Sequence, residues 1–455
     1  MRKSTAAIVA CASVLVACAR HEEATKAVAF PSTYQAMPGQ PTLVANATIL
    51  TGTGERIAQG AVAFKDGRII AVGENVAAPA GSQTIDAAGK WVTPGLIDVH
   101  SHLGVYASPG VAASSDGNEA TAPVTAEVWA EHSVWPQDPG FGAALAGGIT
   151  TLQILPGSAN LIGGRSVTLK NVPARTVQAM KFPGAPYGLK MACGENPKRV
   201  YGEEKLVAPS TRMGNVAGYR KAFIQAADYK QKLENYEKSG EGDAPVRDLG
   251  LETLAGVLSG DILVHMHCYR ADEMAQMLDM ADEFQFKIVA FHHAVEAYKI
   301  ADLLAAHGTC AAMWADWWGF KLEAFDAVRE NIALVEKAGG CAIVHSDSQN
   351  GIQRLNQEAA KAMAAGNRSG IPITREQAIR WLTLNPAKAL GIDKQTGSLE
   401  AGKMADIVIW DRDPFSVYAR VDQVYIDGAL VYDRSDPTHQ PRSDFLLGLT
   451  EGAQP

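Results

Sequence analysis

The feature that most constrains the fold is a long alternation of short apolar strand-like segments with helical patterns, from Pro94 to about Leu390. Strands that alternate with helices form a parallel sheet, because each helix returns the chain to the start of the next strand. A barrel of eight such units takes roughly 250 residues, so this segment is long enough to hold one. The pattern predicts an α/β protein with a TIM-like (β/α)8 barrel over residues 94–393.

Short β-type segments stand on both sides of this alternation and indicate a second, smaller domain. Turn signals such as Asp66-Gly67 and Asp427-Gly428 separate them. The segments cover residues 42–49, 61–64, 68–72 and 83–86 before the barrel, and residues 404–410 and 421–432 after it. We therefore expect the barrel to be inserted in a small discontinuous β-sandwich domain, formed by residues 41–93 and 394–440.

The N-terminal segment reads as a targeting signal rather than as part of the fold. Arg2 and Lys3 precede an apolar segment, and the sequence LVAC that ends at Cys18 resembles the lipobox of a bacterial lipoprotein. We expect a signal peptide with lipobox over residues 1–17 and lipidation of Cys18 as the new first residue. An ordinary secretory signal, cut after Ala19, is the alternative.

Both interpretations predict an exported, periplasmic protein. Residues 18–40 would hold the lipidation site and a polar linker to the first strand. No later segment has about 18 uninterrupted apolar residues, so attachment to the bacterial envelope would be by the lipid anchor alone. The 41 Lys and Arg residues against 49 Asp and Glu residues give a net charge of -8, without a long basic run, which speaks against nucleic acid as a partner.

Histidines stand at the ends of several predicted barrel strands. His100 and His102 are two residues apart, so both rings point to the same side of a strand, at the end where barrel enzymes bind their substrates. The segments 261–268 (DILVHMHC), 287–294 (KIVAFHHA) and 341–348 (CAIVHSDS) also end in histidine or aspartate. Buried imidazoles would be costly as isolated polar groups, whereas a shared metal ion satisfies them. The pattern therefore predicts a metal site at the mouth of the barrel.

The motifs VTPGLIDVHSH, LTLNPAKALGI and GSLEAGKMADIVIWD make the sequence similar to the amidohydrolase superfamily, in the branch of the imidazolonepropionases and metal-dependent dipeptidases. The resemblance covers residues 42–432. It implies metal ligands at His100 and His102 on the first strand, at one histidine on the fifth and one on the sixth strand, and at Asp347 on the eighth. It also implies that Asp347 is the catalytic residue that shuttles the proton.

Two histidine doublets leave a choice of ligand. His265 and His267 share one face of the fifth strand, and the superfamily position corresponds better to His267, which leaves His265 as a contact to a ligand residue or to the substrate. His292 and His293 are adjacent, so they should point to opposite faces of the sixth strand. We expect His293 to be the metal ligand and His292 to be a packed or surface residue.

A bridge between two metal ions has two candidates in the segment GLKMACGENPK. Lys190 lies in the fourth strand, where the superfamily carries a carboxylated lysine, and burial would lower the pKa of its amine enough for reaction with CO2. Glu195 follows Gly194 and would bridge without modification. If neither reaches the metal, the site is mononuclear, and a cyclic-amide hydrolase similar to imidazolonepropionase, or a deaminase, becomes the better reading.

These features predict a metal-dependent hydrolase that cleaves a C–N amide bond. Two divalent ions, zinc first and manganese, cobalt or iron as alternatives, would activate a bridging water, with Asp347 as general base and acid. A binding protein on the same scaffold would have no need of so many strand-end histidines. The resemblance alone implies a homo-oligomer.

The substrate would be a small amide or dipeptide. Tyr269, Arg270 and Tyr201 follow strands on the side of the mouth, and an arginine with a tyrosine could bind a carboxylate. This favours a dipeptidase or an N-acyl-amino-acid hydrolase. The alternative for Arg270 is an ion pair on the next helix.

Four cysteines lie at the ends of predicted strands. Cys310 and Cys341 begin the seventh and eighth strands and would be neighbours at the bottom of the barrel, either as a disulfide or as two free thiols. Cys193 and Cys268 lie nearer the site and are expected to stay reduced.

Overall fold

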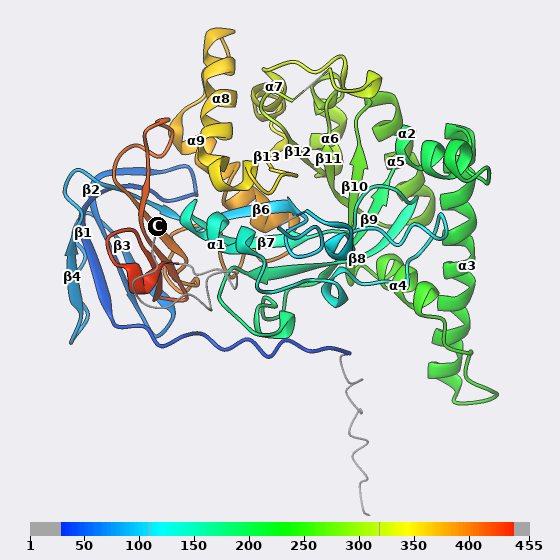
Figure 1. Cartoon of the computed structure of the whole chain (residues 1–455), viewed down its shortest axis with the longest axis horizontal. Helices are drawn as coiled ribbons and strands as arrows, with labels where there is room; N and C mark the ends of the chain where they lie inside the picture. Colours follow the sequence, from blue (N-terminus) through cyan, green and yellow to red (C-terminus); the bar gives the residue numbers. More distant parts are fainter. Residues whose placement is uncertain (1–28, 109, 318, 441–455) are drawn as a thin grey trace, which may run out of the picture. The chain divides into compact units, whose positions relative to one another are not determined.

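The computed structural model describes residues 29–108, 110–317 and 319–440 (Figure 1). The predicted signal peptide and Cys18 lie outside these residues. The chain divides into two units at Pro31, and the unit that begins at Ser32 contains both the barrel and the β-domain. No helix in the described ranges is long and apolar enough to cross a membrane.

The barrel sheet has eight strands, and neighbours in the chain are neighbours in the sheet. The strands are β6 (Leu96–Ser101), β7 (Ile149–Ile154), β8 (Ile162–Lys170), β9 (Tyr187–Ala192), β10 (Ile262–Cys268), β11 (Ile288–His293), β12 (Cys310–Met313) and β13 (Cys341–Val344). Nearly all of their residues are buried, as expected for strands packed on both faces. The sheet is nearly closed, and it confirms the predicted barrel.

One strand departs from the predicted all-parallel order. β8 runs antiparallel to both β7 and β9. No helix lies between β7 and β8, and a strand that is joined by a short loop has to return in the opposite direction. The expectation of a helix after every strand was therefore wrong at this point, although the position of β9 to β13 in the barrel does not change.

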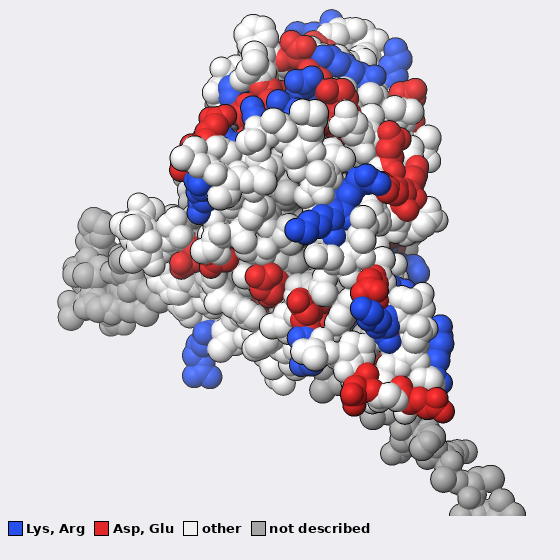
Figure 2. Space-filling view, turned by 90° about the vertical axis from the view of Figure 1, so that its right-hand side faces the viewer, with Lys and Arg blue, Asp and Glu red and all other residues white. Residues whose placement is uncertain are grey.

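Helices cover the outside of the barrel (Figure 1). They are α1 (Pro139–Ala146), α2 (Glu195–Lys198), α3 (Arg212–Ser239), α4 (Leu249–Leu258), α5 (Ala271–Phe284), α6 (Ala301–His307), α7 (Asn331–Lys337), α8 (Leu355–Arg368), α9 (Arg375–Arg380) and α10 (Leu384–Ala389). The longest, α3, begins where the Thr211 side chain accepts a hydrogen bond from the Gly214 amide, and ends at Gly240 in the left-handed conformation (φ 63°). On the face of the molecule that carries α3, basic and acidic side chains are interspersed (Figure 2).

The β-domain is formed from both ends of the chain, as predicted. Its strands are β1 (Thr42–Leu50), β2 (Arg56–Lys65), β3 (Arg68–Gly73), β4 (Gln83–Asp86), β5 (Trp91–Pro94), β14 (Ile407–Trp410), β15 (Val421–Ile426) and β16 (Ala429–Asp433). They form one hydrogen-bonded sheet in the order β16-β15-β14-β5-β1-β2-β3, with β4 beside β1. The sheet folds over one apolar core, in which the rings of Phe64 from β2 and Tyr425 from β15 lie 5.2 Å apart.

The chain enters and leaves the barrel at one place. Pro94, the last residue of β5, is the register partner of Ile407, the first residue of β14. A buried ion cluster fastens the barrel to the β-domain near this place: the Lys170 ammonium lies 3.2 Å from the Asp406 carboxylate and 2.8 Å from that of Asp427. Tyr34 also donates a hydrogen bond to Asp427.

Part of the predicted linker is packed against the folded unit. The Ser32 hydroxyl donates to the carbonyl oxygen of Lys181 at 2.7 Å, and the Thr33 amide donates to that of Gln178 at 2.9 Å. Together with the Tyr34 contact, these bonds show that residues 32–34 belong to the fold. The linker that the sequence predicts up to residue 40 is therefore in contact with the folded unit over these three residues.

Two disulfides connect neighbouring barrel strands. Cys310 and Cys341 are register partners on β12 and β13, and they form the disulfide that was one of the two predicted outcomes. Cys193 and Cys268 also form a disulfide, so the expectation that they stay reduced was wrong. The physical reason is again register: Ala192 pairs with His267, and this places the two cysteines side by side where β9 and β10 end.

Candidate metal centre

His100 and His102 come together with Asp347 at the carboxyl end of β6. The Nε2 atoms of the two histidines lie 3.3 Å apart, and the Asp347 Oδ1 atom lies 3.5 Å from that of His100 and 3.3 Å from that of His102. The His102 ring is oriented by a hydrogen bond on its other nitrogen, because its Nδ1 atom lies 2.8 Å from the carbonyl oxygen of Leu155. The spacing of the two histidines on one strand therefore produces the convergence that the sequence predicts.

The backbone aims the Asp347 carboxylate at this point. Asp347 has a positive φ of 50°, which is uncommon for a residue with a side chain, and its amide donates to the His100 carbonyl oxygen at 3.0 Å. Burial opposes ionisation of the carboxyl group, but the hydrogen bond and charge of His102 hold the pKa of Asp347 below its usual value. The side chain keeps 25% of its surface exposed, so an ionised carboxylate faces the mouth.

His267 and His293 complete this group from β10 and β11. Their ring centroids lie 4.5 Å apart, and the His293 Nδ1 atom lies 3.9 Å from the Asp347 Oδ2 atom. Both rings are buried, yet neither nitrogen of His267 nor the Nδ1 atom of His293 has a hydrogen-bond partner among the described residues. Unpaired buried nitrogens are costly, and coordination to a metal ion would satisfy them.

The expectation that the two rings of the second doublet point to opposite faces was wrong. His292 and His293 both contact His100, each with a ring-centroid distance of 4.8 Å, so both point into the barrel. The alternation of a strand fails here because β11 ends at His293, whose φ of 70° is left-handed. His292 is therefore a buried member of the histidine cluster and not a surface residue.

His345 is a functional candidate that sequence reasoning missed. It follows β13, two residues before Asp347, and a nitrogen of its ring lies within 4.8 Å of ligand nitrogens of His100 and His293. The segment CAIVHSDS contained the signal, since residues two apart on a strand share a face. Only Asp347 was selected from that segment.

The fully buried histidines of this cluster are held neutral, as His100, His265 and His345 show. Burial, followed by the positive charge of Lys190, lowers the pKa of His100 well below 6.5 and that of His265 to about 3. Burial also lowers the pKa of His345 to about 3. A neutral imidazole has a free lone pair, which is the form that binds a metal ion.

Of the two bridging candidates, only Lys190 lies within the histidine cluster. It is fully buried opposite His265 in the register of β9 and β10, and its ammonium donates to the carbonyl oxygen of Pro156 at 3.1 Å. Burial lowers the pKa of Lys190 to about 8. A substantial fraction of this amine is therefore neutral near pH 8, as reaction with CO2 requires.

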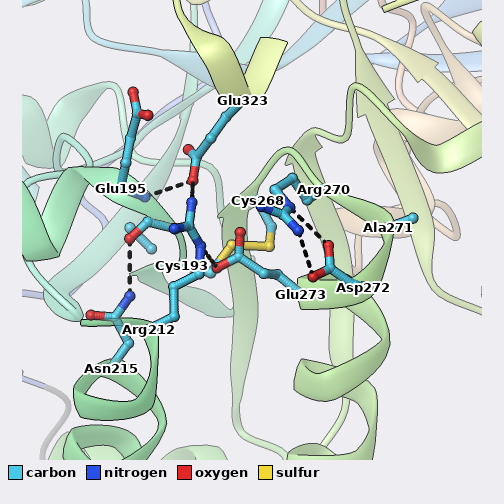
Figure 3. Close-up of a disulfide and its surroundings, with 12 residues drawn as sticks. Cys193, Glu195, Arg212, Asn215, Cys268, Arg270, Ala271, Asp272, Glu273 and Glu323 are labelled. Atoms are coloured by element: carbon cyan, nitrogen blue, oxygen red, sulfur yellow. Dashed lines mark hydrogen bonds and ion pairs between the residues drawn. A yellow bond between two sulfur atoms is a disulfide. The ribbon is translucent and has the colours of Figure 1, made fainter. Parts of the chain in front are cut away.

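Glu195 belongs to a different group of charges. Its carboxylate lies 3.5 Å from the Lys321 ammonium, and its amide donates to the Glu323 carboxylate at 2.8 Å (Figure 3). The Arg212 guanidinium lies between Glu323 and Glu273, beside the disulfide of Cys193 and Cys268 (Figure 3). These contacts place Glu195 in the wall of the mouth.

A cleft of about 400 Å³ opens over the cluster. Its walls include five of the predicted site residues, namely His102, His267, Tyr269, His293 and Asp347, together with Tyr106, Asn118, Asn196, Ser348 and Gln349. The cleft could hold a small molecule beside the ligand nitrogens.

Three predicted substrate contacts lie elsewhere. Arg270 forms an ion pair with Asp272 on its own helix, with N–O distances of 2.9 Å. Tyr201 is buried and donates to the carbonyl oxygen of Ala122 at 2.6 Å. His265 lies below the mouth, where its Nδ1 atom is 3.0 Å from the Nε2 atom of His292.

A lysine that sequence reasoning did not select stands at the mouth instead. The Lys321 ammonium lies 4.0 Å from the centre of the Tyr269 ring and 3.0 Å from the Asn196 side-chain oxygen. Tyr269 and Asn196 both line the cleft. The local sequence does not indicate this position, because Lys321 lies several residues after β12 and contacts the cleft-lining residues Tyr269 and Asn196 only in the folded protein.

A barrel with histidines and an aspartate gathered at the carboxyl ends of its strands is the arrangement of the barrel hydrolases that act on C–N bonds. Comparison with known proteins agrees, since residues 91–431 match the amidohydrolase family. The chain belongs to this family.

Individual relatives cover the same region. An amidohydrolase of Hapsidospora irregularis is 33% identical over 433 residues, which are 87% of this chain but only 43% of that protein, so the chain spans less than half its length. The imidazolonepropionase of Mesorhizobium japonicum is 24% identical over 375 residues and is matched over 87% of its length. The crystal structure of an amidohydrolase from Thermotoga maritima superposes with a TM-score of 0.80 at 38% identity, over 86% of this chain and all of that one.

Proposed function

We propose that this protein is a metal-dependent amidohydrolase that cleaves the amide C–N bond of a dipeptide or an N-acyl amino acid. The observation that carries the proposal is the convergence of His102, His267, His293 and Asp347 on one cleft, with His100 buried beside Asp347 and with ring nitrogens of His267 and His293 left without hydrogen-bond partners. Structural packing alone gives no reason to collect unpaired imidazoles at a barrel mouth.

The residues present could hold a pair of metal ions through two separate sets of ligands. His100, His102 and Asp347 form one group of converging ligand atoms, and the unpaired nitrogens of His267 and His293 would be available to a second ion. Imidazole with carboxylate suits zinc, and manganese, cobalt or iron less well. When bound, such ions polarise a carbonyl group and make water a stronger acid.

Lys190 is the residue we propose as the bridge, in its carboxylated form. Its burial in the cluster and the lowered pKa of its amine support this choice. Glu195 is already committed to Lys321, at 3.5 Å, and we do not assign it to a metal.

Asp347 is proposed as the proton carrier. Its ionised carboxylate faces the cleft and is oriented by His102, so it can accept the proton of the attacking water. The protonated carboxyl group then donates this proton to the leaving amine, which would otherwise depart as an unstable anion. Asp347 would thus serve both the attack of the water and the departure of the amine, from one side of the scissile bond.

The carboxylate of the substrate would bind beside Lys321 and Tyr269. These two side chains take the place that the sequence suggested for Arg270 and Tyr269. The Lys321 side chain is only 17% exposed, and its ammonium lies 3.5 Å from the Glu195 carboxylate and 3.8 Å from that of Glu323, so a substrate carboxylate would compete with these two groups for it.

Hydrolysis of a cyclic amide is the second candidate, because imidazolonepropionases are among the relatives. The deciding experiment measures metal content by elemental analysis beside a screen of dipeptides, N-acyl amino acids and cyclic amides. About two ions per chain, with turnover of carboxylate-bearing linear amides, is the expected result. One ion, with turnover of cyclic amides alone, would replace the proposal with the second candidate.

We also propose export with a lipid anchor on Cys18. The lipobox sequence supports it, and two disulfides within one barrel fit an oxidising compartment. Expression in a bacterium that is fed a labelled fatty acid should label the protein in the membrane fraction, and Cys18→Ser should abolish the label. A labelled Cys18→Ser variant, or an unlabelled wild type in the cytoplasmic fraction, would refute the anchor.

A further inference from the structure

Three buried imidazoles form a line below the metal centre. The His100 Nδ1 atom lies 2.9 Å from the His292 Nδ1 atom, and the His292 Nε2 atom lies 3.0 Å from the His265 Nδ1 atom. All three side chains are fully buried. The line begins at His100, whose other nitrogen, Nε2, faces His102 and Asp347.

The position of the proton on the His100 ring determines the positions of the protons on the other two rings. If the His100 Nε2 atom offers its lone pair to a metal ion, the proton of the neutral ring has to be on Nδ1. That N–H points at the His292 Nδ1 atom, which must accept it, so His292 carries its own proton on Nε2. This second N–H points at the His265 Nδ1 atom, and His265 is left with its proton on Nε2.

The reverse order does not allow metal binding. If His265 donated from Nδ1 and His292 donated from Nδ1, the His100 proton would be on Nε2, where it would occupy the metal-facing lone pair. The one order along this line that leaves the His100 Nε2 lone pair free is therefore the order in which His292 accepts from the His100 Nδ1–H group, and this hydrogen bond orients the His100 ring.

We propose that His292 is the positioning residue of the metal centre, and that His265 fixes His292 from below. This inference rests on the proposed function to the extent that His100 has to be a metal ligand. It assigns a role to the two members of the histidine doublets that the superfamily pattern leaves without one.

The test compares His292→Gln with His292→Leu. A glutamine amide can accept from His100 through its oxygen and donate to His265 through its nitrogen, whereas leucine can do neither. His307→Gln, which removes an exposed imidazole from α6, is the matched control. Each metal-free variant is titrated with Zn²⁺ against a chromophoric chelator and with Co²⁺ by visible absorption, and its melting temperature is measured with and without metal.

We expect His292→Leu to weaken metal binding about 10- to 100-fold and to change the Co²⁺ spectrum. His292→Gln and His307→Gln should stay within a few-fold of the wild type. Equal affinities for the leucine variant and the wild type, or a glutamine variant as weak as leucine, would overturn the positioning role. A wild type that binds no metal would instead refute the proposed function, and the inference with it.

A measurement on the unmodified protein covers the case in which the leucine variant does not fold. Imidazole ¹H–¹⁵N correlation spectra of the zinc-loaded wild type report which nitrogen of each ring carries its proton. The expected pattern is a proton on Nδ1 of His100 and on Nε2 of both His292 and His265. A proton on Nδ1 of His292 would refute the proposal without any substitution.

Discussion

The amide of Asp347 donates a hydrogen bond to the carbonyl oxygen of His100 at 3.0 Å. This bond joins the first and last strands of the barrel sheet, β6 and β13, at the level of the metal centre. The proposed general base and a proposed metal ligand are thus connected through the backbone. The contact between the two edges of the barrel sheet therefore also places the Asp347 carboxylate beside His100.

The first prediction concerns Asp347→Asn. The amide keeps the shape of the side chain but cannot accept the proton, so kcat should fall by about 10²- to 10⁴-fold. The hydrogen bond of the backbone amide does not depend on the side chain, and the melting temperature should stay close to that of the wild type. Steady-state kinetics and thermal unfolding check both points, and a variant with more than a tenth of the wild-type kcat would exclude Asp347 as the base.

The second prediction concerns Lys190. Carboxylation should make zinc reconstitution of the metal-free protein faster and more complete in bicarbonate than in CO2-free buffer. Lys190→Gln should bind at least one ion fewer and should lose the bicarbonate effect, whereas Glu195→Gln should keep both. If the Glu195 variant lost metal and the Lys190 variant kept all of it, Glu195 would replace Lys190 as the proposed bridge.

The third prediction separates Lys321 from Arg270. Lys321→Ala should raise KM for substrates with a free carboxylate by roughly tenfold or more, because a charge-assisted contact contributes about 1.5 to 3 kcal/mol. Arg270→Ala should leave KM within twofold, since this side chain is 42% exposed and paired with Asp272. Substrates whose carboxylate is amidated provide the control. With them, KM of the Lys321 variant should equal that of the wild type.

The fourth prediction compares the two disulfides. Removing either by paired Cys→Ser substitution should lower the free energy of unfolding by up to about 4 kcal/mol, because the bonds close chain segments of 75 and 31 residues. Only loss of the bond between Cys193 and Cys268 should also reduce metal affinity, since Cys268 follows the ligand His267. Equal metal affinities in the two double variants would show that the disulfide between Cys193 and Cys268 does not support the metal site.

The fifth prediction concerns acid stability of the metal-free protein. In the unfolded chain His265 and His345 take up protons below about pH 6.5, but burial in the folded chain holds the pKa of each near 3. The unfolded state therefore binds more protons between these values, and the free energy of unfolding should fall as the pH is lowered from 6.5 to 3. Urea unfolding at pH 7, 5 and 4 measures the slope. His265→Leu should reduce it, and an unchanged slope would contradict the assignment.

The sequence predicted the parts of the site that depend on local geometry. His100 and His102 follow from spacing on one strand, and Asp347 follows from its place at the end of another. The doublet at His292 and His293 could not be resolved this way, because a left-handed residue at the end of a strand cancels the alternation on which the argument depends. Lys321 contacts the cleft-lining residues from a loop, and loops carry no periodic signal.

Long-range register explains the remaining differences. The bond between Cys193 and Cys268 depends on the pairing of Ala192 with His267, which requires the offset between two strands that are separated by α3 and α4. The antiparallel direction of β8 likewise depends on which connection is too short to hold a helix. Both facts become visible only when neighbouring strands are aligned, and a single sequence does not contain that alignment.

The pairing of Pro94 with Ile407 makes the barrel a closed insert, whose two ends lie about 5 Å apart, the usual spacing of antiparallel partners. For the sheet of the β-domain, the barrel is therefore equivalent to a loop whose two ends are held together by the pairing of β5 with β14. The length of chain between these ends does not change their separation. Circular permutants that open the chain on the far side of the barrel should keep every strand neighbour. An exchanged barrel would keep its two ends together in this way, but it would also have to supply a partner for Asp406 and Asp427, as Lys170 does here.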